Sequence, residues 1–416
     1  MTKLQPTLTA LVTTKLAKLR ITIVTETFRP EVNGVAMTLG RLVDGLMARG
    51  HFVQLVRPRQ ARETMAQHQP ELTEVLVPGI PLPTYGELRF GLPSGRRLAR
   101  IWGAQRPDIV HVATEGPLGR SAVAVARRLG LPLTSSFHTN FQSYSQHYGL
   151  GFFKSYIENY LRNLHNRTQA TLVPTESLVR DLVTRGYKDV KLLSRGVAIK
   201  QFSPSKRSQE LRESWGVKPD DVVVLLVGRL AKEKNVRLVI TAFQSIKHHL
   251  PNAKLVFVGD GPQRIQFQAM CPQAVFAGVQ QQESLAAHYA SSDLFLFPSL
   301  TETFGNVVPE ALASGLAVVS YALAAASELI TSGKNGVLVT ADDEVAFINA
   351  SVQLACSRQL QHQYRHAAPL SVAHLDWDAI CDSFLGTLTG VIEQHAQSLK
   401  PVISAGFSRS VSPASA

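Results

Sequence analysis

The sequence predicts an α/β protein made of two doubly wound domains that face each other across a cleft. Short apolar runs, typical of buried strands, alternate with helical segments, which favours parallel sheets covered by helices. This alternation starts twice, once near residue 20 and again near residue 222. A chain of 416 residues also exceeds what one hydrophobic core usually supports, so two domains are expected.

The first half of the chain is expected to contain six strands. They are predicted at residues 20–24, 52–56, 74–77, 108–112, 131–135 and 170–174. An apolar-periodic helix over 35–49 follows the first strand and ends at Gly50, since glycine readily adopts the backbone conformation that closes a helix. Residues 78–93 are rich in Pro and Gly, so they are predicted to form a loop, and an arginine-rich helix comes next.

The second half repeats this pattern. Its strands are predicted at residues 222–227, 254–258, 294–297 and 316–320, and residues 342–395 are expected to be mostly helical. Between the two halves, residues 194–204 have turn chemistry and no strong periodicity, which indicates an interdomain linker.

These elements set the expected domain limits. The predicted parts are a basic N-terminal extension (1–19), a first Rossmann-like domain (20–200), a second Rossmann-like domain (201–375), a C-terminal helix that packs back on the first domain (376–395) and a disordered tail (396–416). The tail is predicted to be disordered because Ser, Pro and Ala dominate it. In such an architecture a ligand binds at the carboxyl ends of the strands, between the domains.

The positive charge of the chain is concentrated in its first half. Residues 1–200 hold 27 Lys and Arg against 13 Asp and Glu, whereas the whole chain has a net charge of +12. We therefore expect the first domain to meet an anionic partner, such as a phospholipid surface or an acidic substrate. Nucleic acid is not expected, because no dense basic tract with interleaved aromatic residues is present.

The sequence also predicts the compartment. No apolar run reaches the roughly 20 residues that span a bilayer, and the basic N-terminus lacks the apolar core of a signal peptide. The three cysteines, Cys271, Cys356 and Cys381, are far apart and have no metal-ligand spacing. Reduced thiols in a cytoplasmic protein are expected.

Two carboxylates bracket the loop after the predicted strand 294–297. Glu302 precedes a turn, and Glu310 lies near the start of a helix that should begin between Asn306 and Val308, because Pro309 is tolerated only in a first turn. A helix N-terminus attracts anions, while carboxylates accept hydrogen bonds from hydroxyls. The residues alone leave open whether these acids bind a ligand or are ordinary turn and first-turn acids.

Other predicted strand ends also carry candidate residues. Gly228, Arg229 and Lys234 could hold a diphosphate, or form an ordinary basic loop. The turn at 259–261 lacks the dinucleotide fingerprint, which disfavours a dehydrogenase, and tight packing explains its glycines better than ligand contact.

The first domain offers a loop and a histidine. Asn33 and Gly34 precede the first helix and could meet a diphosphate, although a purely structural turn is equally consistent with them. A lone histidine is more often structural, but His138 follows a strand whose end faces the cleft in this architecture, so it is also a candidate for ligand contact.

Taken together, these motifs resemble the retaining glycosyltransferases of family 4, which have the GT-B architecture, over about residues 20–395. Residues 302–310 match the E-x7-E motif of the family, and residues 228–235 match its diphosphate loop. Residues 30–35 and 137–140 look like the subgroup of GDP-mannose-dependent α-mannosyltransferases and sulfoquinovosyl- and glycosyl-diacylglycerol synthases. Ala198 departs from the family, in which Asp is frequent at this position.

The resemblance implies a role for each candidate residue. Arg229 and Lys234 would neutralise the leaving diphosphate, Glu310 would accept from the ribose hydroxyls, and His138 would contact the donor sugar. Glu302 would hold the sugar and its phosphate together with the backbone that follows it. The expected donor-binding set is Asn33, Gly34, Gly228, Arg229, Lys234, Gly278, Val279, Glu302, Thr303, Phe304, Gly305, Asn306, Val307 and Glu310. No cofactor or metal is implied.

The resemblance assigns the first domain to the acceptor and the second to the nucleotide sugar. The expected reaction is retaining hexosyl transfer, with GDP-mannose favoured and a UDP-sugar second, to a glycolipid, diacylglycerol or other glycan acceptor at the inner face of the cell membrane. Three rivals remain: a glycoside hydrolase using the two glutamates, a GT-B sugar-nucleotide epimerase, and a non-catalytic binding module.

Overall fold

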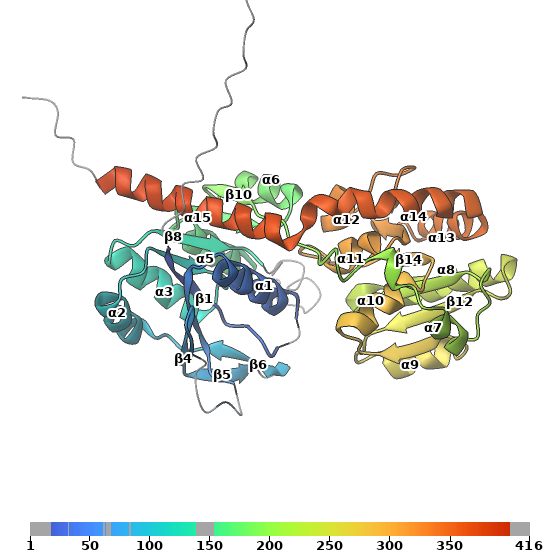
Figure 1. Ribbon diagram of the computed structural model, residues 1–416, viewed down its shortest axis with the longest axis horizontal. Coiled ribbons are helices and arrows are strands. Elements are labelled where there is room, and N and C mark those ends of the chain that lie inside the picture. The colour runs from blue at the N-terminus through green and yellow to red at the C-terminus, as the bar shows by residue number, and fades with distance from the viewer. Residues whose placement is uncertain are drawn as a thin grey trace, which may run out of the picture.

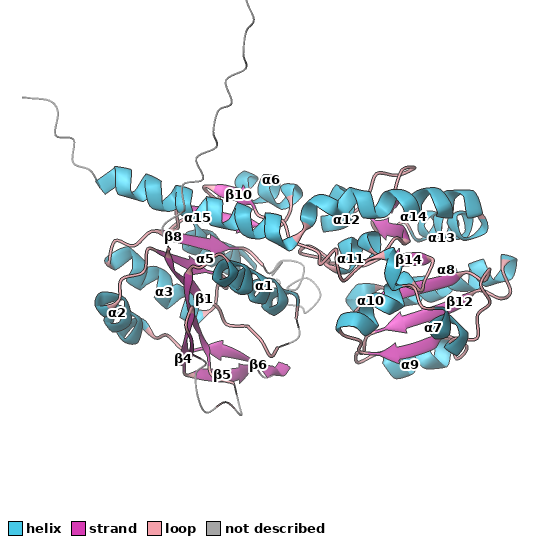
Figure 2. Cartoon of the chain, in the orientation of Figure 1, coloured by secondary structure: helices cyan, strands magenta, loops and turns pink. Residues whose placement is uncertain are grey.

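The computed structural model describes residues 18–31, 33–60, 63, 68–82, 85–138 and 154–399. Two lobes lie side by side, and each contains a mainly parallel sheet with helices packed on it (Figures 1 and 2). The predicted fold class is therefore confirmed.

The sheet of the first lobe has the order β10-β9-β8-β7-β1-β2-β4-β3, and only β3 runs antiparallel to its neighbour. Its strands are β1 (Arg20–Val24), β2 (Phe52–Pro58), β3 (His68–Gln69), β4 (Leu72–Val77), β7 (Ile109–Val112), β8 (Leu133–Ser136), β9 (Ala170–Val173) and β10 (Val190–Leu192). The six predicted strands are all present, within a few residues of the expected limits. The short strands β3 and β10 were not predicted.

The loop predicted over residues 78–93 is wrong. This segment forms an antiparallel hairpin of β5 (Gly79–Leu82) and β6 (Tyr85–Gly91). The Pro and Gly residues of this segment hid its strands, and two of its apolar side chains, Ile80 and Phe90, remain 52% and 38% exposed.

Helices cover the first sheet. They are α1 (Gly34–Ala48), α2 (Gly95–Ala104), α3 (Pro117–Arg128), α5 (Lys154–His165) and α6 (Glu176–Thr184). Helix α1 begins where Asn33 caps it and buries a face that includes Leu39, Leu42, Val43 and Leu46.

The sheet of the second lobe is wholly parallel, in the order β13-β12-β11-β14-β15-β16. Its strands are β11 (Val223–Val227), β12 (Lys254–Val258), β13 (Val275–Gly278), β14 (Leu294–Phe297), β15 (Ala317–Tyr321) and β16 (Gly336–Val339). Strands β11 and β14 are buried along their whole length, as expected for the centre of a sheet with helices on both faces.

The second lobe is rich in helices. Its α-helices are α7 (Gln209–Ser214), α8 (Val236–His249), α9 (Arg264–Met270), α10 (Gln282–Ala290), α11 (Val307–Ala313), α12 (Ala324–Leu329), α13 (Glu344–Cys356) and α14 (Arg358–Val372). Three short 3-10 helices are also described, namely η2 (Pro204–Lys206), η3 (Lys232–Lys234) and η4 (Ala373–Leu375).

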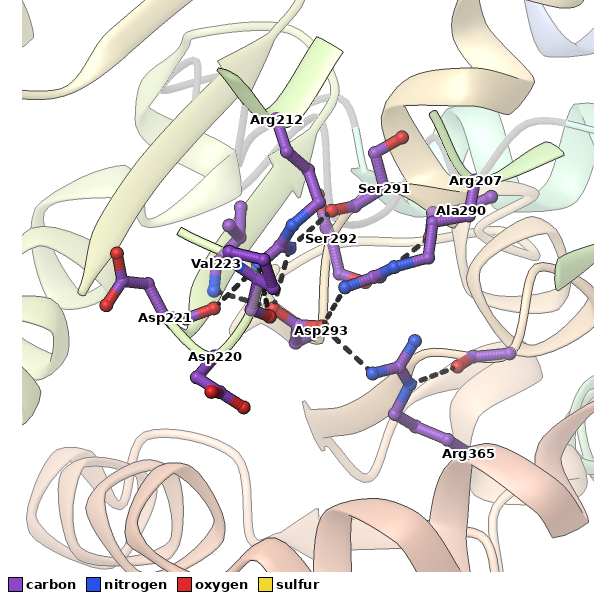
Figure 3. A network of polar contacts seen from close by, with 12 residues as sticks. Arg207, Arg212, Asp220, Asp221, Val223, Ala290, Ser291, Ser292, Asp293 and Arg365 are labelled. Carbon is purple, nitrogen blue, oxygen red and sulfur yellow. Dashed lines mark hydrogen bonds and ion pairs between the residues drawn. The ribbon is translucent and has the colours of Figure 1, made fainter. Parts of the chain in front are cut away.

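Three arginines surround Asp293, the residue just before β14 (Figure 3). Arg207 and Arg365 both lie within 3.0 Å of Asp293 Oδ1, and Arg212 lies 3.0 Å from Oδ2. These arginines come from the segment after η2, from α7 and from α14. The network therefore fixes the amino end of β14 to three other elements, and the opposite end of this strand leads into the loop that carries Glu302.

The chain crosses between the lobes twice, and the two crossings touch. The Val197 amide donates to the Leu375 carbonyl over 2.8 Å. A Cβ added to Gly196 would lie 2.5 Å from the ring of Trp377, so only glycine fits beneath this indole. The segment predicted as a linker is thus held firmly against the second crossing.

After the second crossing, α15 (Trp377–Leu399) runs along the first lobe and packs on α1 (Figure 1). Arg49 Nε donates to Asp382 over 2.7 Å, and Cys381 packs against Gly45. The disordered tail predicted from residue 396 is wrong for 396–399, which are helical, because the first helix-breaking residue is Pro401. Residues 1–17 and 400–416 lie outside the described residues.

The α1–α15 contact predicts opposite effects for one substitution at two glycines. In Gly45→Ala the new Cβ would lie 2.2 Å from Cys381 Sγ, so we expect a loss of roughly 1–3 kcal/mol of unfolding free energy. Gly386→Ala, within α15, meets nothing within 4 Å and should gain roughly 0.5–1 kcal/mol from helix propensity. Urea unfolding measures both, and equal changes would contradict the packing described.

Candidate functional site

Two loops of the second lobe meet at the ends of two neighbouring strands. The chain leaves these two strands toward opposite sides of the sheet. Strand β11 is followed along the chain by β12 on one side, whereas β14 lies on its other side, so the crevice between the ends of β11 and β14 is a topological switch point. The Leu300 amide donates to the Glu233 carbonyl over 2.9 Å, which joins the two loops. The structure thus brings the predicted diphosphate loop against the first half of the E-x7-E segment.

Lys234 and Glu302 form an ion pair between these loops. Ser299 Oγ donates to Glu302 over 2.8 Å, and both partners use the same carboxylate oxygen, Oε1. The side chains of Lys234 and Glu302 are only 19% and 13% exposed, so solvent weakens this pair little. Lys234 therefore orients Glu302 as well as placing a positive charge in the crevice.

Gly305 turns the chain from this loop into α11. Its φ of 85° lies in the left-handed region, which glycine adopts without strain. Helix α11 begins at Val307, after the N-cap residue Asn306, and Pro309 lies in its first turn. The predicted helix start is confirmed. Phe304 is buried and Thr303 half-buried in the same loop.

Glu310, unlike Glu302, is enclosed by the core. The Tyr289 hydroxyl donates to its Oε2 over 2.9 Å, and the residue is 9% exposed. Burial raises the pKa of the Glu310 carboxyl to about 7, although the hydrogen bond from Tyr289 opposes this shift. The two glutamates of the motif therefore have different surroundings.

The glycines after β11 and β12 differ in what surrounds them. Gly228 has a φ of 148° and would meet nothing within 4 Å if it carried a Cβ. By contrast, a Cβ on Gly259 would lie 2.0 Å from the Gly228 carbonyl oxygen, and one on Gly261 would lie 2.4 Å from that of Leu230. Tight packing thus explains the glycines of the 259–261 turn, as predicted. By contrast, the position that a Cβ of Gly228 would occupy borders open space.

The remaining residues of the second-lobe set lie at strand ends. Arg229 is 43% exposed, and its Nη1 lies 3.9 Å from Glu233 Oε1. Gly278 ends β13 and accepts a hydrogen bond from Gly259, whereas Val279 is 60% exposed.

Asn33 and Gly34 occupy the start of α1. Asn33 Oδ1 accepts from the amides of Val35 and Ala36, and its Nδ2 donates to Thr27. The Asn33 side chain is therefore used within its own loop. A Cβ on Gly34 would lie 3.4 Å from Asn306 Nδ2, so this glycine directly faces the α11 loop of the other lobe.

His138 follows β8. Within the described part of the chain, both of its ring nitrogens are buried and lack a hydrogen-bond partner. Burial, with a smaller contribution from Arg195, holds the pKa of His138 well below its ordinary value, so the ring is neutral.

Arg195 was missed by the sequence reasoning, which placed it only in a linker. It lies between Gly34 and Asn306, and its Nη1 donates to Asn306 Oδ1 over 3.4 Å. The guanidinium carbon lies 5.8 Å from the centroid of the Phe304 ring. A lone arginine beside Gly196 gave no periodic or motif signal, since its position depends on how the two crossings pack.

Family models match both lobes. The model described as "Glycosyltransferase Family 4" matches residues 32–201, and that described as "Glycosyl transferases group 1" matches residues 221–357. The chain belongs to glycosyltransferase family 4. The resemblance inferred from the motifs is thereby confirmed, and the protein is an enzyme that transfers sugar from a nucleotide sugar.

Individual proteins agree with this assignment. The glycosyltransferase is 35% identical to a GDP-mannose-dependent alpha-mannosyltransferase of Mycolicibacterium smegmatis, over 91% of this chain and 99% of that one. It is 26% identical to the alpha-monoglucosyldiacylglycerol synthase of Acholeplasma laidlawii, over 79% and 86% of the two chains. Its fold matches sucrose-phosphate synthase of Thermosynechococcus elongatus with a TM-score of 0.71 at 17% identity, over 91% and 100% of the chains.

Burial of Glu310 predicts a pH-dependent effect of Glu310→Gln. Because the folded pKa of about 7 lies above the ordinary value of 4.5, the native state holds an extra proton between these pH values, and stability falls as pH rises through them. Glutamine stays neutral, so at pH 8.5 the variant should exceed the wild type by on the order of 3 kcal/mol. At pH 4 the two should differ little.

Urea unfolding of both proteins at the two pH values measures this difference. A difference that does not change between them would show that Glu310 titrates normally in the folded protein.

Proposed function

We propose that this glycosyltransferase moves a hexose from a nucleotide sugar to a hydroxyl of a membrane lipid with retention of configuration. The favoured sugar is mannose, donated by GDP-mannose. The observation that carries the proposal is the convergence of the 228–235 and 298–306 loops at the switch point, where Lys234 pairs with Glu302 beside Arg229. The named activities of the mannosyltransferase and diacylglycerol-synthase relatives support the choice of sugar donor and lipid acceptor.

Each group of residues has a role in this proposal. Arg229 and Lys234 neutralise the diphosphate, and the open space before Gly228 admits it. Glu302, through Oε2, accepts from the sugar hydroxyls, and the backbone of 303–307 binds the sugar and its phosphate. Glu310 accepts from the ribose.

The remaining contacts come from the rim of the cleft. Backbone near Gly278 and Val279 contacts the base. Gly34 approaches the diphosphate and His138 contacts the sugar, while the Asn33 side chain stays in its cap, so Asn33 contributes through its backbone.

The proposed chemical step uses no protein nucleophile. The bond between the anomeric carbon and the phosphate oxygen breaks, and its electron pair stays on the diphosphate. The acceptor oxygen bonds to the same face of the anomeric carbon while its proton passes to a phosphate oxygen. Arg229 and Lys234 stabilise this developing negative charge, which lowers the barrier. Because these two cations supply the charge, the proposal needs no divalent metal.

The surroundings of the two glutamates favour this mechanism over hydrolysis by an acid–nucleophile pair. Glu302 is ion-paired to Lys234, and Glu310 is enclosed and hydrogen-bonded to Tyr289. A hydrolase of this kind needs one carboxyl group that donates a proton and one free carboxylate that attacks the sugar, whereas the Glu302 carboxylate is bound to a lysine.

A panel of GDP- and UDP-sugars with a lipid extract, followed by nucleotide release in EDTA, tests the donor. GDP-mannose should give the highest acceptor-dependent rate. Arg229→Ala should lower kcat/KM by roughly two to three orders of magnitude, as does loss of one group that stabilises a developing anion. Arg237→Ala, an exposed arginine on the neighbouring helix α8, is the matched control and should retain activity.

If Arg229→Ala turned over as fast as the wild type, Arg229 would not be the residue that neutralises the diphosphate. Faster nucleotide release from a UDP-sugar than from GDP-mannose would show that the donor is the UDP-sugar. Product formation in the absence of an acceptor would favour an epimerase.

The first lobe offers a surface for the anionic membrane that this acceptor requires. Arg96, Arg97 and Arg100 are exposed on α2, and the apolar side chains of Phe90 and Leu92 are 38% and 39% exposed just before this helix. Basic residues beside exposed apolar ones suit an interface with anionic lipid headgroups. We therefore place the enzyme at the inner face of the cell membrane, attached peripherally. No helix among the described residues is long and apolar enough to cross a bilayer.

The double variant Arg96→Ala, Arg100→Ala tests this surface in vesicle flotation. Each basic residue near an anionic surface contributes about 1 kcal/mol, so binding to phosphatidylserine vesicles should weaken roughly 30-fold. Arg237→Ala, Lys247→Ala removes the same charge from the second lobe and should bind normally. Wild-type binding that ignores salt and anionic lipid content would contradict the proposal.

A further inference from the structure

Arg195 is a buried cation whose charge is barely compensated. It is 6% exposed, and its Nε is buried without a hydrogen-bond partner in the described part of the chain. Among the described residues, its guanidinium forms one long hydrogen bond, to the neutral Asn306 side chain, and it lies against the Phe304 ring. No carboxylate within the described residues forms an ion pair with it. Burial lowers the pKa of Arg195 to about 10, and the negative charge of Glu302 opposes this shift.

A buried charge without a partner is unfavourable, and a folded protein usually pairs it or solvates it. The other buried arginines of this chain follow that rule. Arg57 is ion-paired to Glu63 and Glu74, and Arg212 to Asp293. Arg195 is the exception among them, which indicates that its partner is a ligand.

The surroundings of Arg195 define the charge and location of that ligand. Its Nη1 lies 3.3 Å from the position that a Cβ on Gly34 would occupy, at the N-terminus of the 15-residue helix α1. Asn33 accepts from the amides of Val35 and Ala36, whereas no described residue accepts from the Gly34 amide, so this amide can bind a ligand at the positive helix end. Two independent features of the first lobe thus favour an anion at one point, facing the 302–306 loop.

We propose that Arg195 binds the terminal phosphate of the donor's diphosphate from the first-lobe side of the cleft. This inference rests on the proposed function, because the nucleotide sugar is the anion that the facing loops bind. Arg229 and Lys234 hold the diphosphate from the second lobe, while Arg195 offers a planar fork from the first. The phosphate then bridges the lobes, and donor binding favours the arrangement in which they are close.

Calorimetric titration with GDP, GMP and guanosine, and with the uridine series, tests this contact in the full-length protein. In Arg195→Met the affinity for the diphosphate that the wild type binds should fall about 10- to 100-fold, as for loss of a hydrogen-bonded charge. Affinity for the monophosphate and nucleoside should change less than about twofold, because the base and ribose lie on the second lobe. Arg195→Lys should retain part of the diphosphate affinity.

Thermal unfolding without ligand separates a binding role from a structural one. Because methionine removes an uncompensated buried charge, Arg195→Met should melt at or above the wild-type temperature. Arg106→Met is the control, since this arginine donates to the carbonyls of Leu129 and Gly130, and it should melt lower while binding GDP normally.

Each other result has a distinct meaning. Unchanged diphosphate affinity in Arg195→Met overturns the inference, and so does an equal loss for all three ligands together with a lower melting temperature. Unchanged diphosphate affinity with a raised KM for a phosphate-bearing lipid would assign Arg195 to the acceptor instead. A wild type that binds no nucleoside diphosphate would refute the proposed function itself.

Discussion

The contact between the two interdomain crossings is the constraint on which the cleft depends. Gly196 lies beneath Trp377, and the Val197 amide donates to the Leu375 carbonyl. Neither lobe needs this contact for its own sheet, yet it sets where the lobes meet and where α15 begins. Because Arg195 immediately precedes Gly196, the same contact also directs this guanidinium toward the α11 loop.

Within each lobe, the parallel sheet decides which loops become neighbours. Residues 228–235 and 298–306 are far apart in the chain, but they follow β11 and β14, which are adjacent strands. The arginine network around Asp293 anchors the other end of β14, so the Glu302 loop extends from a fixed strand. Side chains carried at the ends of such strands are held more precisely than side chains on free loops.

The two glutamates illustrate how surroundings separate identical side chains. Glu302 is oriented by Lys234 and Ser299 at the crevice, where it stays close to cations. Glu310 lies in the core beneath Tyr289, where burial raises its pKa. Their spacing in sequence is that of one motif, but the fold gives Glu302 an ion pair with a lysine and gives Glu310 a hydrogen bond from a buried tyrosine.

The sequence alone determined the fold class, the strands β11 and β14 whose loops carry Lys234 and Glu302, and a start of α11 between Asn306 and Val308. It could do so because buried parallel strands are continuous apolar runs and because Pro309 restricts where a helix begins. The β5–β6 hairpin escaped prediction because its segment is rich in Pro and Gly, which indicate a loop. Only the tertiary structure placed Arg195 between Gly34 and Asn306 without an ion pair among the described residues, because this unpaired charge arises where segments of the two lobes meet, and no local pattern records that meeting.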